Sequence, residues 1–219
     1  MFAQGVGAEQ ITQFISALND TLTRRVIELN LERHDLVGID WAWLAFGSEG
    51  RDEQTFSTDQ DNGIVFLCTD IMDREHTQLR LLEFARDVNA DLDRCGFPLC
   101  SGKIMASNPA LCLTLEEWEE KFAAWVRTPE PEALLNATIF FDFRPLFGQF
   151  NLAERMRIAL LRQTRGNPLF LRMLAANALT VTPPLGMIRD FVTDEDPEHP
   201  GCIDLKKSGS RLFIDAARV

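Results

Sequence analysis

Hydrophobic and polar positions follow two different periods in the first half of the chain. Residues 8 to 36 and 73 to 94 repeat apolar side chains at spacings of three and four, which is typical of amphipathic helices. The apolar runs 41–46, 63–68 and 97–105 are short and bounded by turn residues, which favours strands. The pattern therefore predicts a helix, two strands separated by a polar segment, a second helix and a third strand.

The second half of the chain is predicted to be mainly helical. Start signals for helices stand at Thr114 with Glu117 (a capping box), Pro131, Asn151 and Asn167-Pro168. Residues 131 to 146 suit either a helix or a strand. We expect residues 112 to 180 to form a helical bundle. A turn-rich acidic stretch over 190–201, a strand at 203–205 and a short helix over 211–219 follow it.

The polar segment between the first two strands holds the candidate chemistry. It closes with Asp59 and Asp61, two residues apart on a predicted strand, so both side chains should point to the same face. Two neighbouring carboxylates repel each other, and a divalent cation relieves that repulsion. Hard oxygen ligands of this kind suit Mg²⁺, or Mn²⁺ in its place. The alternative is a solvated edge strand without a metal.

The same segment opens with Gly47 and Ser48, where a glycine-containing turn enters a short predicted helix. Amide groups at the start of a helix favour an anion. A metal pair on one side and an anion site on the other predict a nucleoside triphosphate as ligand. By itself, Gly-Ser would indicate only an ordinary turn.

These residues also carry a resemblance to a known family. The run Gly47-Ser48-x-x-Arg51-x-Glu53-Gln54-x-x-x-Thr58-Asp59-Gln60-Asp61-Asn62 resembles the nucleotidyltransferase signature of the DNA polymerase β superfamily. More narrowly, it is similar to nucleotidyltransferases related to the protein-PII uridylyltransferases. Those proteins often sit behind CBS or cyclic-nucleotide-binding domains in bacterial signal transduction. The likeness continues at 96–109, 140–145, 167–171 and 203–207, and so covers most of the chain.

The resemblance implies an α+β fold with a polymerase-β-like nucleotidyltransferase core, a small mixed sheet and a following α-helical bundle domain. We expect a helical arm over residues 1–36, the nucleotidyltransferase core over 37–110, and a helical domain with an extended tail over 111–219. CBS or cyclic-nucleotide-binding domains would then be attached in a longer chain.

The resemblance also implies roles for single residues. Asp59 and Asp61 would hold the metal, while Gly47 and Ser48 would bind the β- and γ-phosphates through backbone N–H groups and the Ser48 hydroxyl. Arg51 would reach the same phosphates, or else form a salt bridge to Glu53 or another acid.

Three further residues are candidates. Asn62 would hydrogen-bond near the metal. Lys103 would bind phosphate, or only extend its charge from a strand end. Enzymes of this superfamily usually carry a third carboxylate on a later strand, but residues 97–105 contain none. Asp142 is the replacement candidate for a catalytic role, or else a structural partner of Arg144.

The amino-acid composition argues against some classes of binding partner. The formal net charge of −11 argues against non-specific nucleic-acid binding, which needs a basic face. Five cysteines, an odd number without a C-x-x-C pair, favour a reducing, cytoplasmic setting over disulfides or zinc. The sequence contains no apolar run long enough to cross a membrane.

The predicted activity is transfer of a nucleoside monophosphate, UMP or AMP, from a triphosphate to an acceptor such as a PII-like signalling protein. The alternative is a weakly active or inactive nucleotide-binding regulatory module. The absence of a recognisable third acid favours that alternative.

Overall fold

The computed structural model describes residues 5–56, 58–68, 70–181, 183–186, 191–193 and 199–219. The chain divides into two compact units. The first consists of Met1–Ala123 with Ile139–Leu161, and the second of Ala124–Thr138 with Arg162–Val219. Half of the acidic stretch predicted over 190–201, residues 190 and 194–198, lies outside the described residues.

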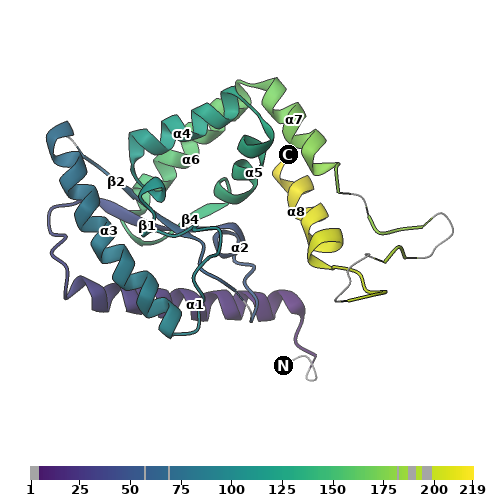
Figure 1. Cartoon of the computed structure of the whole chain (residues 1–219), viewed down its shortest axis with the longest axis horizontal. Coiled ribbons are helices and arrows are strands. Elements are labelled where there is room, and N and C mark those ends of the chain that lie inside the picture. Colours follow the sequence, from purple (N-terminus) through teal and green to yellow (C-terminus); the bar gives the residue numbers. More distant parts are fainter. Residues whose placement is uncertain (1–4, 57, 69, 182, 187–190, 194–198) are drawn as a thin grey trace. The chain divides into compact units, whose positions relative to one another are not determined.

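The helices and strands follow one another in a mixed order (Figure 1). They are α1 (Ala8–Leu31), β1 (Trp41–Phe46), α2 (Gly47–Gly50), β2 (Asn62–Phe66), α3 (Ile71–Arg94), the 3-10 turn η2 (Pro109–Leu111), β3 (Cys112–Thr114), α4 (Leu115–Arg127), α5 (Pro131–Phe140), β4 (Phe143–Gly148), α6 (Phe150–Arg165), α7 (Pro168–Ala178), the π-helical turn η3 (Lys206–Ser210) and α8 (Arg211–Arg218).

The first unit is built on a small mixed sheet with the strand order β3-β2-β1-β4. β1 is antiparallel to both β2 and β4, whereas β2 and β3 are parallel. The predicted α+β class with a small mixed sheet and a helical C-terminal region is therefore confirmed. The sheet also draws on residues 112–114 and 143–148, which lie beyond the 37–110 core that we expected.

Helices cover both faces of this sheet, which explains why β1 is an unbroken apolar run. Trp41 and Trp43 pack with Phe84 of α3 on one face, and α1 adds Val26 and Ile27 to that core. On the other face, Phe46 contacts Trp118 of α4. All six residues of β1 are buried, as expected for a central strand between two helical layers.

Two of the predicted helix starts have the expected capping hydrogen bonds. The Thr114 amide donates to the Glu117 carboxylate at 2.9 Å, and the Glu117 amide donates to the Thr114 hydroxyl at 3.2 Å, so the capping box is present. In the second unit, the Asn167 side-chain oxygen accepts a bond from the Phe170 amide at 3.0 Å and caps α7. Local side-chain chemistry therefore determines these boundaries.

Two predicted strands were wrong, and the expected run of four helices is interrupted once. Residues 97–105 form turns instead of a strand, and Lys103 has a φ of 57°, which an extended strand does not allow. Residues 203–205 are also not a strand. The ambiguous stretch 131–146 divides into helix α5 and strand β4, so the four helices of the expected bundle are interrupted by a strand of the core sheet.

No helix among the described residues combines the length and apolarity needed to cross a membrane.

Candidate active site

The strand register brings three distant segments to one end of the sheet. Ala45 near the end of β1 pairs with Asn62 at the start of β2. Phe46, the last residue of β1, pairs with Phe143, the first residue of β4. The residues that follow β1 therefore lie beside those that precede β2 and β4. The Gly47–Ser48 turn, the aspartates and Asp142 meet there through topology alone.

Two backbone hydrogen bonds fix the Gly47 turn between its neighbours. The Phe46 amide donates to the Asp61 carbonyl, and the Gly47 amide donates to the Asp142 carbonyl, each at 2.9 Å. Gly47 has a φ of 58°, in the left-handed region that favours glycine. A Cβ there would lie 3.6 Å from Asp61 Oδ2, which shows how closely the turn approaches that carboxylate.

This arrangement changes one expected role. Because the Gly47 amide already binds the Asp142 carbonyl, Gly47 does not offer its N–H to a phosphate. Ser48 is the second residue of α2, where helix amides have no partner within the helix. Phosphate binding by Ser48 stays a prediction, and the left-handed backbone of Gly47 permits the turn itself.

The two aspartates lie just before β2 instead of on it, yet their side chains converge. The intervening Gln60 side chain is buried and donates to the carbonyl oxygens of Asn89 and Phe97 at 3.0 and 2.8 Å. Since the backbone alternates, Asp59 and Asp61 point the other way. The strand prediction was off by a few residues, but the predicted shared face is present.

Cys100 joins the two aspartates. Among the described residues, one group of side chains has metal-ligand spacing: Asp59, Asp61 and Cys100 each offer a ligand atom within 4.8 Å of the other two. Asp59 is exposed, Asp61 is half-buried and Cys100 is buried. Two carboxylates and a sulfur are a donor set that fits a divalent cation. Cys100 lies in the segment 97–105, which has no carboxylate, and it was not among the predicted site residues.

Arg51 and Asp142 bind each other. Arg51 Nη1 lies 2.5 Å from Asp142 Oδ2, and Arg51 Nε lies 2.8 Å from Glu53 Oε2. Both carboxylates keep the guanidinium charged and raise its pKa, although burial opposes them as the largest single influence. The expected alternative of a salt bridge to Glu53 is therefore present. Asp142 lies beside the Gly47 turn but is not part of the Asp59–Asp61–Cys100 group.

The Asn62 side chain connects neighbouring segments of the fold. Its side chain is buried, and its oxygen accepts bonds from Asn89 Nδ2 at 3.0 Å and from the Ala106 amide at 2.8 Å. These bonds join β2 to α3 and to the turn segment that holds Cys100. Lys103, by contrast, is exposed in that segment, and phosphate binding by its side chain stays a prediction.

An ion pair between Arg144 and Asp20 holds the short helix α2 in place, and the sequence analysis did not predict it. Arg144 donates two bonds of 2.7 Å to the Asp20 carboxylate and one of 2.9 Å to the Glu49 carbonyl. It thereby connects α1, α2 and β4. Asp20 occupies a buried position of α1, and this departure from the apolar pattern was the available signal.

Glu49, within α2, is buried and strongly perturbed. Burial raises its pKa from 4.5 to about 8, and the charges of Asp20 and Asp61 act in the same direction while Arg144 opposes them. Glu49 therefore carries a proton at neutral pH in much of the folded population. The negative charge around the Gly47 turn is therefore smaller than the number of acidic residues there suggests.

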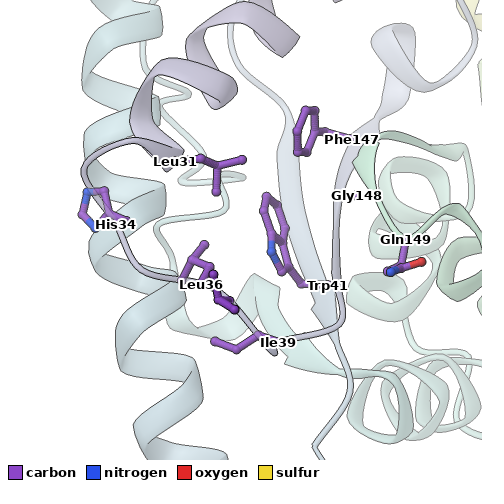
Figure 2. A pocket seen from close by; sticks show the side chains of 9 residues that line it. Leu31, His34, Leu36, Ile39, Trp41, Phe147, Gly148 and Gln149 are labelled. Carbon is purple, nitrogen blue, oxygen red and sulfur yellow. The ribbon is translucent and has the colours of Figure 1, made fainter.

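A hollow lies at the end of β1 that is opposite to the Gly47 turn. It encloses about 450 Å³ and is lined chiefly by apolar side chains, with Trp41 and Phe147 facing it and His34 at its margin (Figure 2). Trp41 is the first residue of β1, whereas the Gly47 turn follows the last. This hollow is therefore separate from the aspartate pair by the length of a strand.

Comparison with protein families agrees with the geometry. Residues 1–132 match a family model described as "Putative nucleotidyltransferase DUF294". Residues 168–219 match one described as "Putative nucleotidyltransferase substrate binding domain". No curated protein matches the chain. Since the first model covers more than half of the sequence, the chain belongs to this nucleotidyltransferase family.

Proposed function

We propose that the protein transfers a nucleoside monophosphate, UMP or AMP, from a nucleoside triphosphate to an acceptor, with a PII-like signalling protein as the first acceptor to test. The family match supports nucleotidyl transfer as the general activity. The observation that carries the proposal further is the convergence of Asp59 and Asp61 beside the Gly47–Ser48 turn.

In the proposed reaction, an acceptor oxygen bonds to the α-phosphorus, and the bond from that phosphorus to the β-phosphate oxygen breaks. Pyrophosphate leaves, and the acceptor proton passes to solvent. Asp59 and Asp61 would hold the divalent cation, Mg²⁺ or Mn²⁺. When bound, such a cation supplies positive charge that neutralises the reacting phosphates.

The chain's own residues supply positioning in this proposal. The Ser48 hydroxyl and amide bind the terminal phosphates, and α2 is held at that place by the Arg144–Glu49 hydrogen bond. Arg51 stays half-buried against Asp142 and Glu53. It reaches a phosphate only by exchanging one of these carboxylates for the ligand. A phosphate contact from Arg51 therefore belongs to the loaded state of the site.

The test is incubation with labelled UTP, ATP, CTP or GTP, Mg²⁺ or Mn²⁺, and candidate acceptor proteins. Transfer should be lost, by about 100-fold or more, in Asp59→Asn and in Asp61→Asn. Asp93→Asn removes an exposed carboxylate of α3 and should leave the rate unchanged. Full transfer by both site variants would refute the role of the aspartates.

A regulatory nucleotide-binding module is the second candidate. It is favoured by one observation: within the described residues, the metal-ligand group contains two carboxylates and a thiol in place of a third carboxylate. The same assay separates the two functions. Nucleotide binding that needs Asp61, without turnover on any acceptor, supports the module.

A further inference from the structure

The position of Cys100 is set by the backbone around it. The Gln60 amide donates to the Pro98 carbonyl and the Asn62 amide donates to the Ile104 carbonyl, each at 3.1 Å. These bonds tie the turn segment to the aspartate strand on both sides of Cys100. Within the turn, the Lys103 amide donates to the Cys100 carbonyl at 2.9 Å. The thiol is therefore held beside the aspartates by bonds that do not involve its own side chain.

The surroundings of Cys100 differ from those of an inert core cysteine. Cys112 lies in the apolar core, where burial raises its pKa to about 12. Cys100 is also buried, with 8% exposure against 0% for Cys112, and burial raises its pKa too, but its Sγ faces two carboxylates. Asp61 lies within hydrogen-bond reach of the thiol. A buried sulfur beside two carboxylates is an arrangement that can bind a metal ion.

We propose that Cys100 Sγ is the third protein ligand of the cation held by Asp59 and Asp61, and that this ligand makes the site prefer a divalent transition-metal ion to Mg²⁺. The inference rests on the proposed function and deepens it. When the sulfur–metal bond forms, the thiol proton leaves to solvent and no electron is transferred.

Ligand softness gives the direction of the preference. Mg²⁺ favours oxygen donors in a strict octahedron and gains little from a sulfur ligand. Mn²⁺, Co²⁺ and Zn²⁺ accept mixed oxygen and sulfur donors, and affinity generally rises from Mn²⁺ to Co²⁺. An aspartate at position 100 would instead produce an all-oxygen site. One side chain therefore determines which class of cation the site selects.

Co²⁺ is the probe for the experiment, because thiolate coordination gives it a charge-transfer absorption band in the near ultraviolet. The wild-type protein should show this band, saturating at one equivalent. Cys100→Ser should lose the band and bind Co²⁺ about 10-fold more weakly or worse. Cys95→Ser, which alters an exposed cysteine at the end of α3, should retain both band and affinity.

Cys100→Asp provides the opposite change. It should bind Mg²⁺ more tightly than the wild type and Co²⁺ more weakly, so the Co²⁺-to-Mg²⁺ affinity ratio falls by about 10-fold or more. If Cys100→Ser does not fold, X-ray absorption of Co²⁺-loaded wild-type protein decides, because a sulfur neighbour at the metal distinguishes this site from an all-oxygen one.

The outcomes separate this inference from the proposed function. Co²⁺ binding that is abolished in Asp61→Asn but unchanged in Cys100→Ser, without a thiolate band, overturns the role of Cys100 and leaves the aspartate site intact. Co²⁺ binding that survives in Asp61→Asn overturns both. Loss of the band in Cys100→Ser together with weaker binding in Asp61→Asn supports both.

Discussion

The ion pairs of this protein differ in burial, and burial determines how much each is expected to contribute to stability. The pair between Arg144 and Asp20 is largely buried, with 17% and 9% of the side chains exposed. The pair between Arg25 and Glu28 on α1 exposes 62% and 49%. Exposed pairs contribute little to stability, whereas a buried charge that loses its partner is costly.

Arg144→Lys should therefore destabilise the protein by about 1–3 kcal/mol, because lysine cannot reproduce the two parallel bonds to Asp20 or the bond to the Glu49 carbonyl. Urea unfolding followed by circular dichroism measures the change. Arg25→Lys is the matched control and should shift the unfolding free energy by less than about 0.5 kcal/mol. Equal effects of the two substitutions would contradict the assignment of Arg144 as a connecting residue.

Glu49 predicts a distinct dependence of stability on pH. Burial raises the pKa of Glu49 in the folded state to about 8, from a value of 4.5 in the unfolded chain. At pH values between these two pKa values, the folded state keeps a proton that the unfolded state has released. Stability should therefore be fully present at acidic pH and decline as the pH rises towards about 8. The contribution is at most about 1.4 kcal/mol per pH unit.

Glu49→Gln should flatten this decline, because glutamine has no proton to release. Urea unfolding at pH 5.5, 6.5 and 7.5, values spaced about one unit apart within this window, compares the variant with the wild type. Glu28→Gln, an exposed change on α1, should keep the wild-type slope. A variant with the same slope as the wild type would show that another group titrates in this range.

At the scale of elements, α2 depends on its close approach to the segment before β4. A Cβ added at Gly50 would lie 2.3 Å from the Asp142 carbonyl oxygen and 3.1 Å from that of Ala45. Backbone atoms on two sides leave no room for a methyl group. The short helix and the start of β4 are therefore packed as one unit, and Gly50 is the residue that allows it.

Gly50→Ala should displace α2 from β4, costing about 1–3 kcal/mol of stability and lowering nucleotidyl transfer, since the Ser48 turn moves with α2. Thermal unfolding and the transfer assay measure the two effects. Gly7→Ala is the control, because nothing lies within 4 Å of a Cβ there. A Gly50→Ala protein with normal stability and rate would show that α2 has freedom to shift.

At the scale of the whole molecule, net charge opposes the proposed ligand. The chain carries a formal charge of −11, and a nucleoside triphosphate is itself strongly anionic. Long-range repulsion therefore works against binding unless a cation lies between the phosphates and the aspartates. On the proposed function, the metal is therefore expected to be required for nucleotide binding as well as for the chemical step.

A nucleotide with a divalent cation should raise the melting temperature, and the nucleotide with EDTA should not. At a ligand concentration about 100 times the Kd, the stabilisation is about 2.7 kcal/mol, or about 5–10 °C for a protein of this size. Differential scanning fluorimetry measures the shift, which Asp61→Asn should abolish. An equal shift in EDTA would place the nucleotide away from the aspartates.

Much of this organisation was readable from local patterns. The apolar run 41–46, the periodic helices and the Thr114 capping box each depend on neighbours within a few residues. The expected shared face of Asp59 and Asp61 was also correct in outcome, because alternation of an extended backbone is a local property.

Local pattern did not reveal which residues complete the site. Residues 97–105 resemble a strand in composition but form turns, because their backbone groups bond to the aspartate segment and not to a regular ladder. Asp142 was predicted as a third acid or as a partner of Arg144. In the structure it binds Arg51, and its catalytic role stays a prediction. Arg144 instead binds Asp20, 124 residues away.

By itself, the amino-acid sequence determined the fold class, most element positions and the aspartate pair, since periodicity, capping and alternation are short-range effects. Only the tertiary structure decided that Cys100 joins the aspartates, that the Gly47 amide is already engaged and that Arg51 lies between two acids. These choices depend on strand register and on contacts between residues far apart in the chain, which no local pattern encodes.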